Sequence, residues 1–267
     1  MLTLEEIHIY PIKSLPGVRV SNSVVMEKGL QYDRRLMLID ERGQFMTQRT
    51  RPEMCLFHVT LNGSEFSIED KSGIQIEKLK IDLSKSWSGT IINAVVWDDE
   101  VEVIEVDPLT SLWFSNIFKL SCRLVAFPEL NHRRIDPDYS PEDRNVSLAD
   151  GYPMLMISRE SLDLLNSKLA HPVGMNRFRP NLVVSGGSSH EEDFLKRFRI
   201  GSNIFAAVKP CARCVLTTVD PETAKVGTEP LKTLSEYRKN SNKVNFGMNI
   251  IPQSDGQIQE GDEIRGL

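Results

Sequence analysis

Short stretches in which hydrophobic and polar residues alternate run through the first part of the chain. Such stretches, rich in β-branched and aromatic residues and bounded by turn signals such as Pro-Gly and Asn-Gly, are typical of half-buried β-strands. Short strands at these intervals favour a barrel or a strongly bent sheet. The strands expected here are 2–10, 23–26, 36–39, 56–61, 74–79, 95–97 and 101–106.

Two segments have the periodicity and the start signals of helices. In the first, Asp107 can cap the helix and Pro108 suits its first turn. In the second, Ser158 precedes the helix and Gly174 follows its end. The residues expected on the buried faces are Leu109, Leu112, Trp113, Ile117 and Leu120 in the first helix, and Leu162, Leu165 and Leu169 in the second.

The rest of the chain returns to strands after a polar, proline-broken loop at residues 131–145. Loops of this length are usually functional or disordered, and we hypothesise that this one covers a pocket. The strands expected after it are 182–185, 203–209, 215–219 and 244–251, with 262–264 as a final edge strand. The pattern predicts an α+β fold that is strand-dominated and has two interlocked lobes meeting near residue 120.

Composition narrows the class of protein. The 267 residues are 40% hydrophobic and carry a net charge of −5, which argues against binding nucleic acid or a membrane surface through bulk charge. No apolar run approaches the roughly 20 residues of a membrane span, and the first residues do not form a signal peptide. Four cysteines in a chain of this length make no disulfide framework. We expect a cytoplasmic protein.

Reactive chemistry concentrates at Cys211-Ala212-Arg213-Cys214. A thiol beside a fixed cation tends to be a thiolate, which binds metals or attacks electrophiles. A zinc site needs four ligands, and neither the other cysteines nor the five histidines show the spacing. A thioredoxin-like pair begins a helix, whereas 215–219 is expected to be a strand. Burial as two small hydrophobes stays open, although Cys55 and Cys122 suit that role better.

Basic side chains recur at expected strand ends and turns. Several arginines and a Lys-Ser pair delivered by loops suit a phosphate-bearing anion, because guanidinium forks and hydroxyls match phosphoryl oxygens. There is no glycine-rich phosphate loop and no dinucleotide fingerprint. The residues therefore indicate an anionic cofactor beside a metal-binding sulfur. The basic positions are Lys13 (followed by Ser14), Arg34, Arg35, Arg49, Arg177, Arg179 and Arg213.

Several short motifs occur in the order found in a known family. Tyr-Pro-Ile-Lys-Ser at 10–14, Tyr-Asp-Arg at 32–34 and Met-Thr-Gln-Arg at 46–49 resemble the N-terminal β-barrel of MOSC proteins. Asp-Gly-Tyr-Pro at 150–153, Asn-Arg-Phe-Arg-Pro-Asn at 176–181 and Pro-Cys-Ala-Arg-Cys at 210–214 resemble the MOSC domain. The resemblance, strongest to the mitochondrial amidoxime-reducing component and YcbX-like proteins, implies an N-terminal β-barrel domain at 1–120 and a MOSC domain at 121–267.

The resemblance also implies a cofactor and its ligands. The family binds the molybdenum cofactor, a pyranopterin phosphate, and a protein cysteine completes the sulfur ligation of the metal. Cys214 matches that cysteine, which leaves Cys211 without a direct role, and Asp150 matches an aspartate near the metal that we hypothesise assists proton delivery. The positions that match the family's grip on the pterin and its phosphate are Lys13, Ser14, Arg34, Arg179 and Asn181.

The implied activity is the reduction of N-hydroxylated compounds such as amidoximes, N-hydroxylated bases and hydroxylamines. No cysteine follows Cys214 to hold an iron–sulfur cluster, so electrons are expected from a separate ferredoxin, flavodoxin or cytochrome b5-type protein with its reductase. Gly151 and Tyr152 replace hydroxyl-bearing residues of the mitochondrial relatives. The alternative function is a non-catalytic cofactor carrier or a sulfur-transfer protein, although the chain lacks an aminotransferase-like portion.

Overall fold

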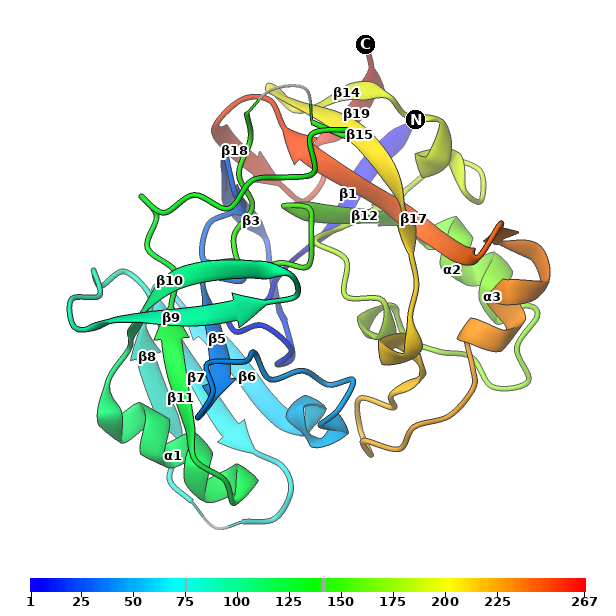
Figure 1. The fold of residues 1–267 in the computed structure, drawn as a ribbon. Coiled ribbons are helices and arrows are strands. Elements are labelled where there is room, and N and C mark those ends of the chain that lie inside the picture. The colour runs from blue at the N-terminus through cyan, green and yellow to red at the C-terminus, as the bar shows by residue number, and fades with distance from the viewer. Residues whose placement is uncertain (75, 141–142) are drawn as a thin grey trace.

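The computed structural model describes residues 1–74, 76–140 and 143–267. It has two strand-rich lobes side by side (Figure 1), with helices only at their outer surfaces. The expectation of a strand-dominated α+β fold with interlocked lobes is confirmed.

The second lobe is a closed barrel of seven strands. Each strand pairs with the next, and the last, β17, pairs with the first, β12. Gly247 permits this closure, since a Cβ there would lie 2.5 Å from a side-chain carbon of Ile157. In barrel order the strands are β12 (Met154–Ser158), β13 (Leu182–Ser185), β1 (Leu2–Ile9), β19 (Glu263–Gly266), β14 (Arg197–Ile200), β15 (Asn203–Ala212) and β17 (Lys243–Pro252).

Alternation along the barrel strands separates two apolar cores. Met154 and Met156 of β12 point into the barrel, whereas Leu155 and Ile157 join a second core outside it. That outer core is covered by α2 (Arg159–Asn166), α3 (Leu231–Tyr237) and the 3₁₀ turns η2 (Met175–Arg177) and η3 (Glu191–Phe194).

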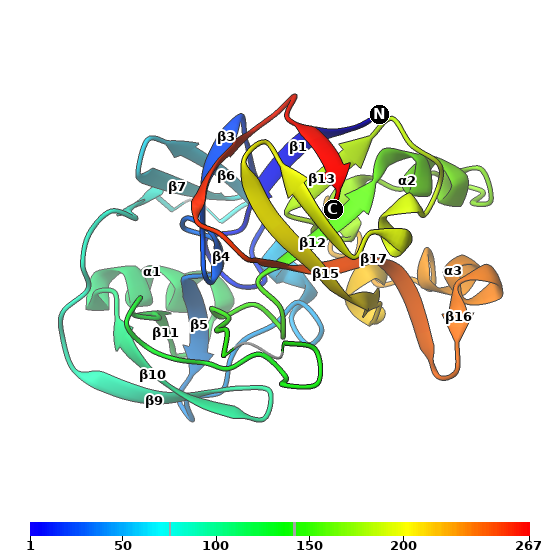
Figure 2. The ribbon, with the colours of Figure 1, turned by 90° about the horizontal axis from the view of Figure 1, so that it is seen from above.

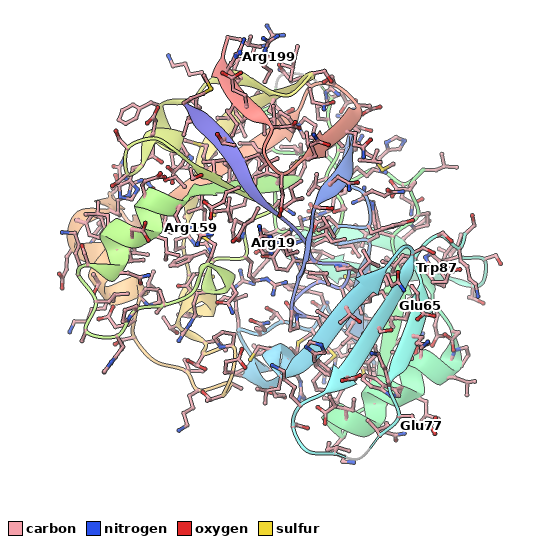
Figure 3. All side chains as sticks on the ribbon, turned by 180° about the vertical axis from the view of Figure 1, so that it is seen from behind. Arg19, Glu65, Glu77, Trp87, Arg159 and Arg199 are labelled. Carbon is pink, nitrogen blue, oxygen red and sulfur yellow. The ribbon has the colours of Figure 1, made fainter. Side chains whose placement is uncertain are left out.

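The first lobe consists of two sheets packed around the helix α1 (Pro108–Phe118). The four-stranded sheet has the order β5 (Leu36–Asp40), β11 (Cys122–Ala126), β10 (Asp99–Glu105) and β9 (Ile91–Val96). The three-stranded sheet, seen from behind in Figure 3, contains β6 (Phe57–Asn62), β7 (Glu65–Asp70) and β8 (Leu79–Asp82). The turn η1 (Pro52–Cys55) connects them.

The two lobes exchange strands. β1, the first strand of the chain, lies between β13 and β19 in the barrel, as Figure 2 shows from above. β11, which follows residue 121, belongs to the first lobe. The predicted boundary at residue 120 therefore separates two stretches of sequence, but each lobe contains a strand from the other side of that boundary. The remaining strands are β2 (Val18–Val20), β3 (Asn22–Met26), β4 (Gly29–Leu30), β16 (Lys239–Asn240) and β18 (Gly256–Gln259).

An ion network fastens this exchange on the rear of the molecule (Figure 3). Arg19 of β2 contacts Glu6 of β1 and Glu260 near β18. Arg159 of α2 reaches the same Glu6. These groups are partly exposed, so each pair contributes little to stability.

The helix starts are as predicted, but one buried face is not. The carboxylate of Asp107 accepts from Thr110 N, and the hydroxyl of Ser158 accepts from Ser161 N. The second helix ends at Asn166, well before Gly174. Leu109 and Leu112, expected inside, are 78% and 55% exposed. The buried face of α1 is instead rich in aromatic residues and contains Trp113, Phe114, Ile117 and Phe118.

Three expected strands differ in the structure. Residues 215–219 form the 3₁₀ turn η4 (Val215–Thr218), because the Thr217 and Thr218 hydroxyls donate to carbonyls three residues back. The expected edge strand at 262–264 lies between β1 and β14 instead. The strand expected at 74–79 includes residue 75, outside the described residues, and the strand observed there begins at Leu79.

The longest α-helix in the described part of the chain has 11 residues. None of the described helices is long and apolar enough to cross a membrane.

Candidate functional site

Turns of the second lobe meet turns of the first lobe around a cavity of about 150 Å³. The sequence positions of these turns are far apart: they follow β1 and β4, precede β12 and β13, and follow β15. All seven residues expected in the site lie around this one pocket. They are Lys13, Ser14, Arg34, Asp150, Arg179, Asn181 and Cys214.

The pocket is strongly basic, although the whole chain has a net charge of −5. Among its described lining residues, Asp150 is the single carboxylate. A concave site with an excess of guanidinium groups attracts an anion, and its field is stronger than at an open surface. The basic lining residues are Lys13, Arg34, Arg49, Arg179 and Arg213.

Two sulfur atoms reach the pocket, and each accepts a hydrogen bond from a guanidinium group. Arg49 Nε donates to Cys214 Sγ over 3.3 Å, across the two lobes. Arg213 Nη1 donates to Cys211 Sγ over 3.0 Å. Both cysteines are half-buried and free. These donors hold each sulfur in a fixed direction at the pocket wall, and the thiolate is the form of cysteine that ligates metals.

The environment of the other two cysteines is the opposite. Cys55 and Cys122 are 4% and 3% exposed and pack in or beside apolar clusters. Burial raises the pKa of both thiols. Their interpretation as buried small hydrophobes fits this geometry.

The 3₁₀ turn η4 bears on whether Cys211 and Cys214 form a redox pair. Cys214 is the N-cap of this four-residue turn and no strand follows it, so the expected strand no longer weighs against a redox pair. The choice between a redox pair and a metal ligand therefore needs the variants described below.

Arg49 was expected from the sequence only as one of several basic positions, and its contact with the Cys214 thiol was not predicted. It lies after β5 in the first lobe, and besides Cys214 it contacts Asp150, with Nη2 3.0 Å from Oδ2. Its motif at 46–49 was visible in the sequence, but no sequence signal places this turn against the thiol of a residue 165 positions later.

Asp150 is held by three donors. Lys13 Nζ lies 2.6 Å from Oδ1, Arg49 donates to Oδ2, and Trp97 Nε1 donates to Oδ1 over 3.2 Å. Burial favours the neutral acid, but Lys13 and Arg49 outweigh it and hold the pKa of Asp150 well below its usual value. Burial also lowers the pKa of the Lys13 ammonium, which the Asp150 carboxylate opposes. Asp150 is thus a carboxylate at neutral pH.

Arg34 is oriented by neighbouring side chains. Its Nη1 donates to both oxygens of the buried Asp33, at 2.9 and 2.7 Å, and to Asn181 Oδ1 at 2.9 Å. Asn181 is 1% exposed, and its amide also bonds the backbone of Leu155 and His8. In this geometry Asn181 fixes Arg34 and ties β13 to β1 and β12.

Tyr10 supports two arginines at once. The guanidinium carbons of Arg34 and Arg179 lie 4.1 and 4.3 Å from its ring centroid. Burial raises the pKa of Tyr10 to about 12, so the phenol stays neutral and donates to Pro180 O. Gly17 makes room for the ring, because a Cβ there would lie 2.4 Å from it.

Arg179 forms no ion pair in this environment. Within the described residues its guanidinium forms no hydrogen bond either, and burial lowers its pKa to about 10 against the opposing effect of Asp33 and Asp150, which leaves it charged at neutral pH. Arg213 Nε is buried and has no partner in the described part of the chain. Arg179 also lines a second cavity of about 290 Å³. These unpaired donors fit an anionic ligand.

The backbone of the site is strained. Ser14, Arg34 and Arg179 have φ of 68°, 48° and 56°, in the left-handed region that favours glycine. Each such residue costs about 1 kcal/mol or more. Strain at three of the expected site residues is typical of positions that are held for function.

The loop at 131–145 does not line this pocket in its described residues, and residues 141–142 lie outside the description. Tyr139 packs against Tyr152 with ring centroids 6.2 Å apart, and Lys209 Nζ lies 3.7 Å from the Tyr139 ring. The loop therefore supports Tyr152, which does line the pocket, and the structure gives no support to the hypothesis that it covers the opening.

Comparisons with known proteins match the sequence of this chain to a family. The MOSC N-terminal beta barrel domain matches residues 1–121 and the MOSC domain matches residues 143–265. Mitochondrial amidoxime-reducing component 1 of Homo sapiens is 31% identical over 98% of the chain and 82% of its own length.

Molybdenum cofactor sulfurase of Solanum lycopersicum is also 31% identical over 98% of the chain, which spans only 35% of that larger protein. Among solved structures, the YUAD protein of Bacillus subtilis covers 99% of the chain and 94% of its own at 12% identity, with a TM-score of 0.42. From the two family matches and the relative aligned over most of its length, the chain belongs to the MOSC family.

Proposed function

We propose that the protein is an oxidoreductase that binds the molybdenum cofactor and reduces N-hydroxylated compounds with electrons from a separate redox protein. The observation that carries the proposal is the Cys214 sulfur, held by Arg49 at the wall of a basic pocket that contains unpaired guanidinium donors. The amidoxime-reducing relative, similar over nearly the whole chain, supports the substrate class.

The residues present suit the cofactor. Cys214 would ligate the metal, and Arg179 and Arg213 have free donors for the phosphate and the pterin. Lys13, Ser14 and Arg34 would complete the grip, with Asn181 fixing Arg34. Bound in this way, the cofactor supplies two electrons to the N–O bond. Arg49 would keep the Cys214 sulfur in its direction.

The overall change is R–NH–OH + 2e⁻ + 2H⁺ → R–NH₂ + H₂O. Asp150 stays in the proposed active site as a carboxylate that orients Lys13 and Arg49. Its lowered pKa opposes the role of proton donor expected from the sequence, because a strong acid is unprotonated at neutral pH. We infer that the protons come from water at the pocket opening, where the Asp150 side chain is 57% exposed.

The proposed partners are a small N-hydroxylated substrate and a ferredoxin, a flavodoxin or a cytochrome b5-type protein with its reductase. Four free cysteines favour a reducing compartment, and we propose the cytoplasm. The second candidate function is a cofactor carrier or sulfur-transfer protein. It is favoured by the match to the sulfurase, which covers the same residues of this chain.

The test uses protein from a host that makes the cofactor, with molybdenum measured by elemental analysis and benzamidoxime reduction driven by reduced methyl viologen. We expect stoichiometric molybdenum and turnover. Cys214→Ser should lose both, whereas the matched variant Cys211→Ser should keep the metal, because the resemblance assigns ligation to one sulfur only. Metal without turnover of any N-hydroxylated compound would favour the carrier. Equal behaviour of the two variants would favour a two-cysteine module and refute the proposed ligand.

A further inference from the structure

Trp97 occupies a backbone position that suits glycine. Residues 97 and 98 form the two-residue turn between β9 and β10, with Asp99 opposite Val96. Trp97 has φ of 60°, and a positive φ at the first turn residue is normally supplied by glycine. A bulky aromatic residue in this region is a genuine outlier, with a cost of roughly 1–2 kcal/mol. Such a departure from turn chemistry is expected where a side chain has a function.

Three contacts fix the indole ring. Phe45 meets it edge-on, with centroids 4.9 Å apart and planes at 60°. The guanidinium carbon of Arg49 lies 4.5 Å from its ring, and its Nε1 donates to Asp150 Oδ1. A side chain with this many partners is usually buried, yet Trp97 is 42% exposed. Trp113, in the core of the same lobe, is 9% exposed.

The exposed ring lies next to the pocket through its contacts, although Trp97 itself is not one of the lining residues. Arg49 and Asp150, which hold it, both line the pocket, and Arg49 also touches the Cys214 sulfur. The β9–β10 turn points from the first lobe toward the second (Figure 1). The first lobe thus presents a rigid aromatic surface one residue away from the proposed reaction centre.

We propose that Trp97 is a binding platform that selects substrates whose N–O group is attached to a flat π system, such as arylamidoximes and N-hydroxylated heterocycles. A preoriented indole gains stacking energy from such a ring without losing conformational freedom of its own. Aliphatic amidoximes present no face for stacking. This inference rests on the proposed function, because it names the preferred substrates of the same site.

The test compares benzamidoxime with acetamidoxime on the cofactor-loaded enzyme, since the two carry the same reacting group. Stacking on an aromatic side chain contributes roughly 5- to 100-fold. We expect Trp97→Ala to lower kcat/KM for benzamidoxime by about tenfold or more within that range, while acetamidoxime changes little. Trp97→Phe keeps a ring but lacks the Nε1 donor to Asp150, and it should restore most of the preference. Phe194→Ala removes an 82% exposed aromatic side chain elsewhere and should change neither substrate.

Two results would overturn the inference. Either an equal loss for both substrates in Trp97→Ala, or a Trp97→Phe variant as impaired as Trp97→Ala, would mean that Trp97 acts by positioning Asp150 instead. Calorimetric binding of benzamide and acetamide, which are neutral and differ only in the aromatic ring, separates this inference from the proposed function. If neither amidoxime is reduced, the proposed function fails, while a benzamide preference that Trp97→Ala abolishes still supports the platform and its absence refutes it.

Discussion

Ionisable groups gather in two regions, the pocket between the lobes and the outer layer of the second lobe, and the two environments affect their charge differently. At the pocket, Asp150 and Lys13 meet opposite charges and stay ionised, and Arg179 stays charged without an ion pair. In the outer layer under α2, α3 and η3, burial is the dominant influence. There it raises the pKa of Glu192 and lowers the pKa of His190, so both neutral forms are favoured.

Hydrogen bonds oppose the effect of burial at Glu192 without outweighing it, and His190 has no such partners among the described residues. Glu192 is fully buried and receives bonds from the hydroxyls of Ser158 and Ser161, at 2.7 and 2.8 Å. Both ring nitrogens of His190 are buried and lack partners among the described residues, and its ring packs against Tyr237 and Phe246. A region built for stability neutralises its buried groups, whereas a region built for a ligand keeps charges that the ligand can compensate.

The largest expected effect concerns the thiols. In the cofactor-free chain Cys211 and Cys214 should react with a disulfide reagent such as DTNB at least about a thousandfold faster than Cys55 and Cys122, since buried thiols react only through opening of the structure. The rates are followed by absorbance. The double variant Cys211→Ser/Cys214→Ser should show no fast phase, and a fast phase that persists would place reactive thiols outside the pocket.

The next effect separates stability from binding. Arg179→Met removes a desolvated cation that has the Tyr10 ring but no ion pair, and the Met side chain can still pack on that ring, so the cofactor-free chain should be as stable as the wild type or more stable in urea denaturation. Loss of one charge-assisted contact should weaken cofactor retention by about 10- to 100-fold, measured as pterin and molybdenum remaining after dialysis.

The matched control for this prediction is Arg177→Met, two residues earlier. Arg177 pairs with Asp220 at 2.8 Å and does not line the basic pocket. It should retain the cofactor and lose a little stability instead. A clear destabilisation of the cofactor-free chain by Arg179→Met would show that this cation has a structural partner and would remove the contrast between the two regions.

The smallest effect tests the outer layer. The pKa of His190 is lowered in the folded state, so below about pH 6.5 the unfolded chain binds a proton that the folded chain does not. Stability of the wild type should therefore fall as the pH drops through this window, by about 1.4 kcal/mol for each unit of the shift. His190→Asn, which tolerates the positive φ, should remove this slope. Parallel pH curves in urea denaturation would contradict the prediction.

Many of the helices and strands could be predicted from the sequence, and the wrong predictions have physical reasons. Capping residues and alternation are local signals, so the starts of α1 and α2 and most strands were predicted. The prediction of a strand at 215–219 was wrong because threonine, which suits a strand, can equally bond the backbone of a turn through its hydroxyl, as Thr217 and Thr218 do. The prediction that Leu109 and Leu112 are buried was wrong because aromatic side chains form most of the buried face of the same helix.

The site shows the same limit at longer range. A family resemblance predicted the seven site positions, and all seven lie around one pocket, while their roles remain proposals. Arg49 and Trp97 were not assigned, since their importance depends on which turn of the first lobe meets Cys214. Strand pairing between residues near opposite ends of the chain, as in β1 with β19, decides that and leaves no local signal.

The position of β1 between β13 and β19 has a consequence for biosynthesis. During translation β1 is made before β13 and well before its other neighbour β19, so the barrel cannot close until β19 has been synthesised. Until then an apolar edge stays exposed, a condition under which nascent chains tend to aggregate or recruit chaperones. Either half expressed alone would lack strands that the other supplies, so an attempt to produce the lobes separately should yield insoluble material.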